Sequence, residues 1–242
     1  MATAYRDMSA SELLALAPPG WGGVLLDGLI VSLQVALLGY LIGLGIGLVG
    51  ATLKRSGGPV TRDLMSVYTT LVRAIPELVL ILLAYFAMPE LVNTLLSAAG
   101  QPRIEINGFV AGVLVIGFVQ GAYATEVLRG AMASVPVGHI EAAQSFGMHP
   151  WCIFHRITLP ELLPSALPGL SNLWLIATKD TALLAVVGFT ELTLAARQAA
   201  GATKHHFLFL MAAGALYLIV TLLSAQLFRV LENRANRGAR HV

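Results

Sequence analysis

The sequence predicts an all-α membrane protein with five transmembrane helices. Of its 242 residues, 57% are hydrophobic and only 12% are charged, a composition too apolar for an ordinary soluble domain. The apolar residues also gather in runs that can each supply the roughly 20 residues needed to cross a bilayer. These predicted segments lie near residues 24–53, 62–88, 108–133, 166–189 and 207–231.

Residues 1–21 are expected to form a separate, outward-facing segment before the first crossing. They lack the basic region, apolar core and small-residue cleavage site of a secretory signal. Ser9 or Ser11 could cap a short leucine-rich helix, which Pro18 would stop. We expect this helix to lie along the membrane surface with Trp21 at headgroup level, and a frayed tail is the alternative.

The first crossing carries a stripe of glycines. Gly39, Gly43, Gly47 and Gly50 recur on nearly one helix face. Small residues four apart allow helices to approach closely in lipid. We therefore interpret the stripe as a packing surface, with a glycine-lined translocation path as the alternative.

Charged residues inside the apolar segments need partners, since an ionised side chain at membrane depth costs at least about 2.5 to 3.5 kcal/mol. Arg73 and Glu77 are four residues apart, so they could neutralise each other on one helix face if the helix survives Pro76. Pro76 could instead break the helix, as happens at substrate sites in transporters. Lys179 and Asp180 are adjacent and point in different directions, toward other helices or a substrate.

These buried charges suit a substrate that carries a carboxylate and one or two cations. Arg73 or Lys179 could hold the carboxylate, and Glu77 or Asp180 the cations. Internal ion pairs that only fix helix positions are the alternative. The predicted pathway residues, including three that offer neutral hydrogen bonds, are Arg73, Glu77, Gln120, Tyr123, Asn172, Lys179 and Asp180.

Glu126 and Arg129 fall near the end of the third crossing, where we expect them to brace the helices rather than to contact substrate. The histidines near the following polar stretch, His139, His149 and His155, lack the spacing of metal ligands, so no metal site is predicted. None of the three lysines follows a glycine or precedes Ser or Thr, so the chain has no phosphate-binding loop of its own.

An odd number of crossings places the two termini on opposite sides of the membrane. Basic residues concentrate around the first connection, the polar stretch and the C-terminus, which should therefore be cytoplasmic. They are Lys54, Arg55, Arg62, Arg129, Arg156, Arg229, Arg234, Arg237 and Arg240. The opposite connections balance Arg103, Arg197 and Lys204 with Glu90, Glu105 and Glu191. We expect an outward N-terminus and a cytoplasmic tail over residues 235–242.

The long polar break at about 134–165 predicts a short helix, a turn and a second short helix held outside the bilayer. Residues 141–143 favour helix, Gly147 can turn the chain sharply, and Pro150 and Pro160 cannot continue a helix without losing a hydrogen bond. Small side chains there leave room for another protein to approach. Phe146, Trp151 and Phe154 offer apolar area on which it could dock.

This break resembles the EAA loop of the permease subunits of bacterial ABC importers. Every fixed position of that motif is filled, by Glu141, Ala142, Ala143, Gly147, Ile157, Leu159 and Pro160. Four further stretches, Arg73–Leu78, Tyr123–Gly130, Val135–His139 and Lys179–Thr181, are similar to the polar amino acid permeases, and most to the Q-type subunits of histidine, lysine, arginine and ornithine importers.

The resemblance implies a type I ABC importer permease fold over residues 22–234 in a bacterial inner membrane. The chain would be a transport subunit rather than an enzyme, importing basic amino acids with ATP and Mg²⁺ bound by a partner ATPase dimer. A periplasmic binding protein and a second homologous permease subunit, making a heterodimer, are the other implied partners, with no nucleic acid. The implied coupling residues are Glu141, Ala142, Ala143, Ser145, Phe146, Gly147, Ile157, Leu159 and Pro160.

Four alternatives stay open at this point, one of which, a channel or assembly subunit, would need no alternating access and is disfavoured by the match to the loop motif. The substrate could be an opine or another polar amino acid, because selection rests largely on the binding protein. The permease pair could be a homodimer. An ion-coupled secondary transporter is the remaining candidate, although no doubling of the five segments marks the inverted repeats of that class.

Overall fold

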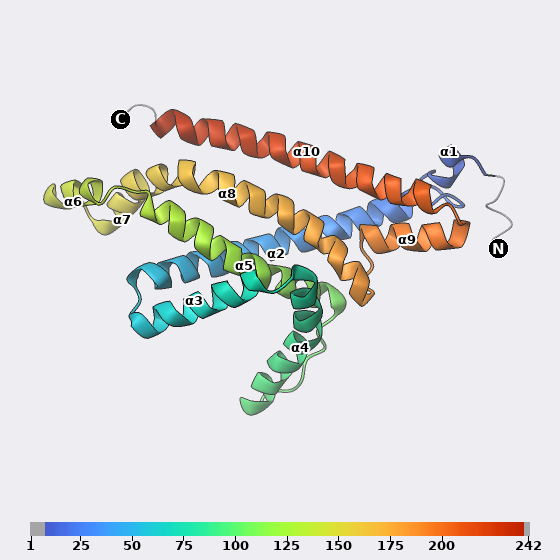
Figure 1. Ribbon diagram of the computed structural model, residues 1–242, viewed down its shortest axis with the longest axis horizontal. Helices are drawn as coiled ribbons and strands as arrows, with labels where there is room; N and C mark the ends of the chain where they lie inside the picture. The colour runs from blue at the N-terminus through green and yellow to red at the C-terminus, as the bar shows by residue number, and fades with distance from the viewer. Residues whose placement is uncertain (1–7, 240–242) are drawn as a thin grey trace.

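The computed structural model describes residues 8–239, and within them every regular element is helical. Figure 1 shows long helices side by side, with α1 and α9 at one end of the molecule. The α2–α3 connection, α6, α7 and the last turn of α10 lie toward the other end. The elements are α1 Ala10–Leu13, α2 Gly22–Ser56, α3 Pro59–Ala74, α4 Glu77–Ala98, α5 Gly108–Ala133, α6 Val137–Ser145, α7 Pro150–Ile153, the π-helical turn η1 Phe154–Thr158, α8 Leu159–Asp180, the 3₁₀ helix η2 Thr181–Val187, α9 Leu192–Thr203 and α10 His206–Ala239.

Five helical stretches within the described residues are long and apolar enough to cross a membrane, as predicted. They are Gly22–Ser56, Glu77–Ala98, Gly108–Ala133, Pro150–Val187 and His206–Asn236. The predicted fourth crossing, 166–189, begins too late, because the helix already runs from the polar loop and ends at Asp180.

The predicted second crossing, residues 62–88, is wrong. The chain there forms two helices, because α3 ends at Ala74 and α4 begins at Glu77. Ile75 precedes a proline and is extended (ψ 138°), and Pro76 has no N–H to continue the ladder. The membrane-crossing helix is therefore α4, which leaves the bundle steeply in Figure 1, while α3 is a separate amphipathic helix.

The glycine stripe packs α2 against α5, which confirms the packing interpretation. A Cβ atom added at Gly47 would lie 2.5 Å from the Cβ of Ala124, and one at Gly43 would lie 2.8 Å from the Cβ of Gln120. Gly39 and Gly50 meet α5 equally closely. The alternative of a glycine-lined path is wrong, since α5 fills the space above the stripe.

The N-terminal segment forms a docked helix rather than a frayed tail over the residues that the structure describes; residues 1–7 lie outside them. Ser9 caps α1 in a capping box, with its N–H donating to the Glu12 carboxylate at 2.7 Å. Leu13 is buried against α9 and α10 beside Leu192 and Phe209. Whether α1 lies along a membrane surface stays a prediction.

Glu191 was expected among the charges of an outer connection, but the structure buries it completely. Its Oε1 accepts the N–H of Leu194 at the start of α9, at 2.9 Å. Its Oε2 accepts the hydroxyls of Ser32 (3.1 Å) and Tyr217 (2.8 Å). A buried carboxylate is stable only with such partners. Glu191 thus ties α2, α9 and α10 together.

Candidate coupling loop and translocation path

The first helix of the polar loop, α6, ends in the turn that the motif glycine predicts. Gly147 has φ +70°, a conformation that residues with a Cβ rarely adopt. Its N–H donates to the Gln144 carbonyl at 2.9 Å, and the N–H of Met148 donates to the Ala143 carbonyl at 3.1 Å. These two bonds are the Schellman pattern of a helix C-terminus. Gly147 therefore sets the direction in which the chain leaves α6.

The second part of the loop differs from the predicted separate short helix. Pro150 begins α7, as expected, with the ring of His149 accepting the Trp151 N–H at 3.3 Å. The chain does not stop at Pro160, however. The π-helical turn η1 leads directly into α8, with the Leu159 N–H donating to the Phe154 carbonyl five residues back. The wider turn shifts the hydrogen-bond register just before Pro160, so the missing N–H there does not end the helix.

The loop presents an aromatic surface, as the sequence predicted. Phe146 is 87% exposed and Trp151 is 64% exposed, and the ring of Trp151 stacks on Phe154 with centroids 5.9 Å apart. Ala143 and Ile153 are buried, and the two helices of the loop contact each other. Exposed aromatic groups of this kind mark surfaces that bind another protein.

Several contacts anchor the loop to the bundle. The ring of His139 in α6 lies 2.6 Å from the Glu161 carboxylate of α8, and the Ser134 hydroxyl donates to Ser165 at 3.0 Å. The motif residues Ile157, Leu159 and Pro160 line a cavity of about 690 Å³ between the loop and α10. The loop can therefore pass a displacement to the helices on either side of it.

Most of the predicted pathway residues come together where α3, α4, α5 and α8 meet. The Tyr123 hydroxyl donates to Glu77 at 3.4 Å, and the Arg73 guanidinium lies 5.9 Å from the centre of the Tyr123 ring. The Gln120 side chain donates to Asp180 at 3.3 Å. The Oε1 atom of Gln120 is buried and has no hydrogen-bond partner among the described residues, so it is an open acceptor at this site.

Two expectations about the pathway need correction. Arg73 and Glu77 make no ion pair in the described part of the chain, because the break at Pro76 removes the shared helix face, and both side chains approach Tyr123 instead. Asn172 and Lys179 are exposed on α8 and form no hydrogen bond with the described side chains around Asp180. The polar cluster therefore contains five of the seven predicted pathway residues, namely Arg73, Glu77, Gln120, Tyr123 and Asp180.

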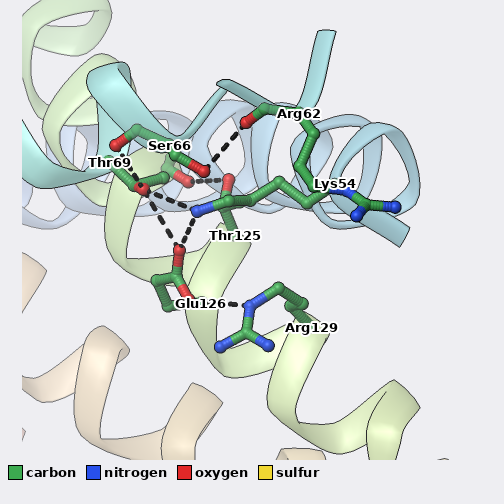
Figure 2. A network of polar contacts seen from close by, with 8 residues as sticks. Lys54, Arg62, Ser66, Thr69, Thr125, Glu126 and Arg129 are labelled. Carbon is green, nitrogen blue, oxygen red and sulfur yellow. Dashed lines mark hydrogen bonds and ion pairs between the residues drawn. The ribbon is translucent and has the colours of Figure 1, made fainter. Parts of the chain in front are cut away.

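The expected bracing at the end of the third crossing is confirmed, and it is more extensive than predicted (Figure 2). Glu126 of α5 accepts from Lys54 of α2 at 2.5 Å, from the Thr69 hydroxyl of α3 at 3.1 Å, and from Arg129 at 2.9 Å. Neither Lys54 nor Thr69 was predicted to belong to this network. Lys54 lies four residues after Gly50, so extending the glycine stripe by one step would have placed it against α5.

Known proteins match this chain over most of its length. A family model described as binding-protein-dependent transport system inner membrane component matches residues 39–237. The octopine transport system permease protein OccQ of Rhizobium radiobacter is 39% identical over 96% of this chain and 98% of its own length. The histidine/lysine/arginine/ornithine transport system permease protein HisQ of Salmonella typhimurium is 39% identical over 91% and 97%. A crystal structure of an amino acid ABC transporter with histidines superposes with a TM-score of 0.73 at 29% identity, covering 88% of this chain and 95% of that one.

Proposed function

Because this chain belongs to the family of binding-protein-dependent transport system inner membrane components, we propose that it is the permease subunit of an ATP-driven importer of basic amino acids. The observation that carries the proposal is the loop of α6 and α7, which exposes Phe146 and Trp151 while its other end continues into α8. An ion-driven transporter has no need of such a docking surface. Octopine is the alternative substrate, since the octopine and histidine permeases resemble the chain to the same degree.

The loop would couple transport to ATP hydrolysis on a separate subunit. The partner ATPase dimer would bind ATP and Mg²⁺, and its closure would move the surface around Phe146 and Trp151. The His139–Glu161 contact and the continuous helix through η1 would carry this displacement to α8. The membrane helices would then alternate between outward and inward access.

The polar cluster around Tyr123 would form the translocation path. Arg73 suits the substrate carboxylate, while Glu77 and Asp180 suit its cationic groups, because charge-assisted hydrogen bonds are the strongest available in such a site. The open acceptor of Gln120 could take one further N–H donor. A permease with both acids in its path would favour substrates that carry an extra positive charge.

The remaining partners follow from the family and the shape of the chain. Only 11% of the apolar window of α4 is buried within this chain, so lipid or a second, homologous permease subunit would cover it. We favour a heterodimer. The end with α1 and α9 would face the periplasm and meet the substrate-binding protein, and the end with α6 and α7 would face the cytoplasm of a bacterial cell.

Two measurements test this function. Affinity purification of the tagged chain from its own cells should recover an ATP-binding subunit and a second permease. The cognate binding protein, assayed against all the common amino acids and octopine, should prefer arginine, lysine, histidine or ornithine. Recovery of the chain without an ATPase would overturn the proposal, and tight binding of octopine alone would establish the alternative substrate.

A further inference from the structure

A basic cavity of about 330 Å³ lies at the Lys54–Glu126 network (Figure 2). Its lining comes from α2, α3 and α5 and consists of Lys54, Arg62, Ser66, Glu126 and Arg129. Three cationic side chains against one carboxylate leave an excess of two positive charges. The cavity therefore attracts an anion rather than a cation.

The donors of this cavity are only partly used. Both oxygens of Glu126 are already occupied, by Lys54 and Thr69 on one side and by the Nε of Arg129 on the other. Among the side chains that the structure describes, none accepts from the terminal nitrogens of Arg129 or from the Arg62 guanidinium. A guanidinium presents its donors in a fixed fork that matches a carboxylate or phosphate. The cavity thus offers two open forks to an oxyanion.

The cavity lies on the same face of α3 as part of the polar cluster of the path. Arg62, Ser66, Thr69 and Arg73 follow one another at spacings of four, three and four, so they occupy one face of α3. Contacts to α5 occur along this face, where Thr69 meets Glu126 at 3.1 Å and Arg73 lies over Tyr123. Arg62 to Arg73 spans about 16 Å of helix. The predicted substrate cluster and the basic cavity therefore lie on one face of α3, with the buried Thr69 between them.

We propose that the basic cavity is an exit subsite that binds the α-carboxylate of the imported amino acid after it leaves Arg73. This inference rests on the proposed function and names a second position for the substrate on its way to the cytoplasm. When the membrane helices shift toward inward access, the positive excess attracts the carboxylate and repels a cationic side chain, so the amino acid leaves carboxylate first. Arg62 and the free nitrogens of Arg129 hold the carboxylate while Glu126 stays paired.

A protection experiment on the assembled, nucleotide-free transporter in nanodiscs tests this subsite. In a Cys152→Ser background, Ser66→Cys places a thiol in the cavity for a negatively charged thiol reagent. Arginine should slow the modification, whereas argininamide, which lacks the carboxylate, should not. Adding Arg62→Gln should raise the arginine concentration for half-protection roughly ten-fold, equivalent to about 1.4 kcal/mol.

The controls separate this proposal from its alternatives. Arg103→Gln, which removes an exposed arginine paired with Glu90 elsewhere in the chain, should leave protection unchanged. Absence of protection by arginine, or equal protection by argininamide, would overturn the subsite. Modification that slows when phosphatidylglycerol replaces phosphatidylcholine, without arginine, would assign the cavity to a lipid phosphate instead. ATP-driven arginine uptake by the same complex tests the importer function separately from the exit subsite. Uptake without protection of the Ser66→Cys thiol would overturn only the exit subsite.

Discussion

Gly147 is the single residue on which the geometry of the coupling loop depends most directly. An alanine at φ +70° costs about 1 to 2 kcal/mol. We expect Gly147→Ala to tilt α7 away from its docked position and to lower ATP-driven uptake severalfold while membrane insertion stays normal. Gly138→Ala is the matched control, because Gly138 lies in the same loop with open space around it and an ordinary backbone. Equal uptake by both variants would contradict this role.

Glu126 has a structural role that can be separated from transport by measuring stability. The Lys54 side chain is only 10% exposed, so Glu126→Leu leaves a nearly buried ammonium group without its carboxylate. Since Glu126 itself keeps some exposure, we expect a loss of about 1 to 3 kcal/mol, visible as a lower melting temperature in detergent. The double variant Lys54→Met/Glu126→Leu should recover part of that loss. A double variant less stable than Glu126→Leu would show that the pair is not the cause.

The capping box of α1 makes this short helix sensitive to acid. The hydrogen bond from the Ser9 backbone N–H, followed by the one from its hydroxyl, lowers the pKa of Glu12 below its ordinary value of 4.5. The folded pKa is the lower one, so the stabilisation is present above pH 4.5 and disappears as the pH falls through the folded pKa. Hydrogen exchange in α1, corrected for intrinsic rates, should rise in that range. Glu12→Gln should remove the pH dependence, and an unchanged profile in this variant would argue against the box.

The α2–α5 contact can be tested with two glycines of the same helix. Gly47→Ala places a Cβ 2.5 Å from Ala124 and must push the helices apart, at a cost of about 1 to 3 kcal/mol. Gly45→Ala is the control, because nothing lies within 4 Å of the added atom. Thermal unfolding should separate the two variants, and equal melting temperatures would mean that α2 and α5 do not pack this closely.

The helices differ in how far the sequence could predict them. The glycine stripe and Gly147 were readable because local spacing and conformational freedom decide their roles. The boundary between α3 and α4 could not be predicted in the same way. Hydrophobicity averaged along the sequence runs on across Ile75 and Pro76, whereas the backbone conformation changes at those two residues. The burial of Glu191 was missed for a different reason: its partners Ser32 and Tyr217 are distant in sequence and are brought together only by the fold.

The same limit applies to the site. Glu126 and Arg129 stand out as charges inside an apolar segment, so bracing could be predicted, but Lys54 looked like one more basic residue of a cytoplasmic connection. Arg73, Glu77 and Asp180 were found because charge in a membrane segment is costly. That Lys179 would stay outside their cluster depends on the rotation of α8, which an isolated sequence does not determine.

The orientation of the whole protein in the membrane can be measured with its own cysteine. Cys152 is exposed on α7, next to Trp151. If α6 and α7 face the cytoplasm, a membrane-impermeant maleimide should label inverted vesicles and leave intact spheroplasts unlabelled. Co-expression with the ATPase should slow the labelling. Rapid labelling from the outside of the cell would reverse the orientation proposed here.

The uninterrupted run from Pro150 through η1 to Asp180 has a mechanical consequence. It is about 46 Å of helix, with the exposed Trp151 near one end and Asp180 of the polar cluster at the other. Because the helix is continuous, we expect a displacement at Trp151 to reach Asp180 directly, although Pro164 and Pro168 each remove one hydrogen bond of α8. Closure of the partner ATPase and the change in shape of the proposed path would then occur together. ATP hydrolysis without transport would indicate that the helix bends at η1.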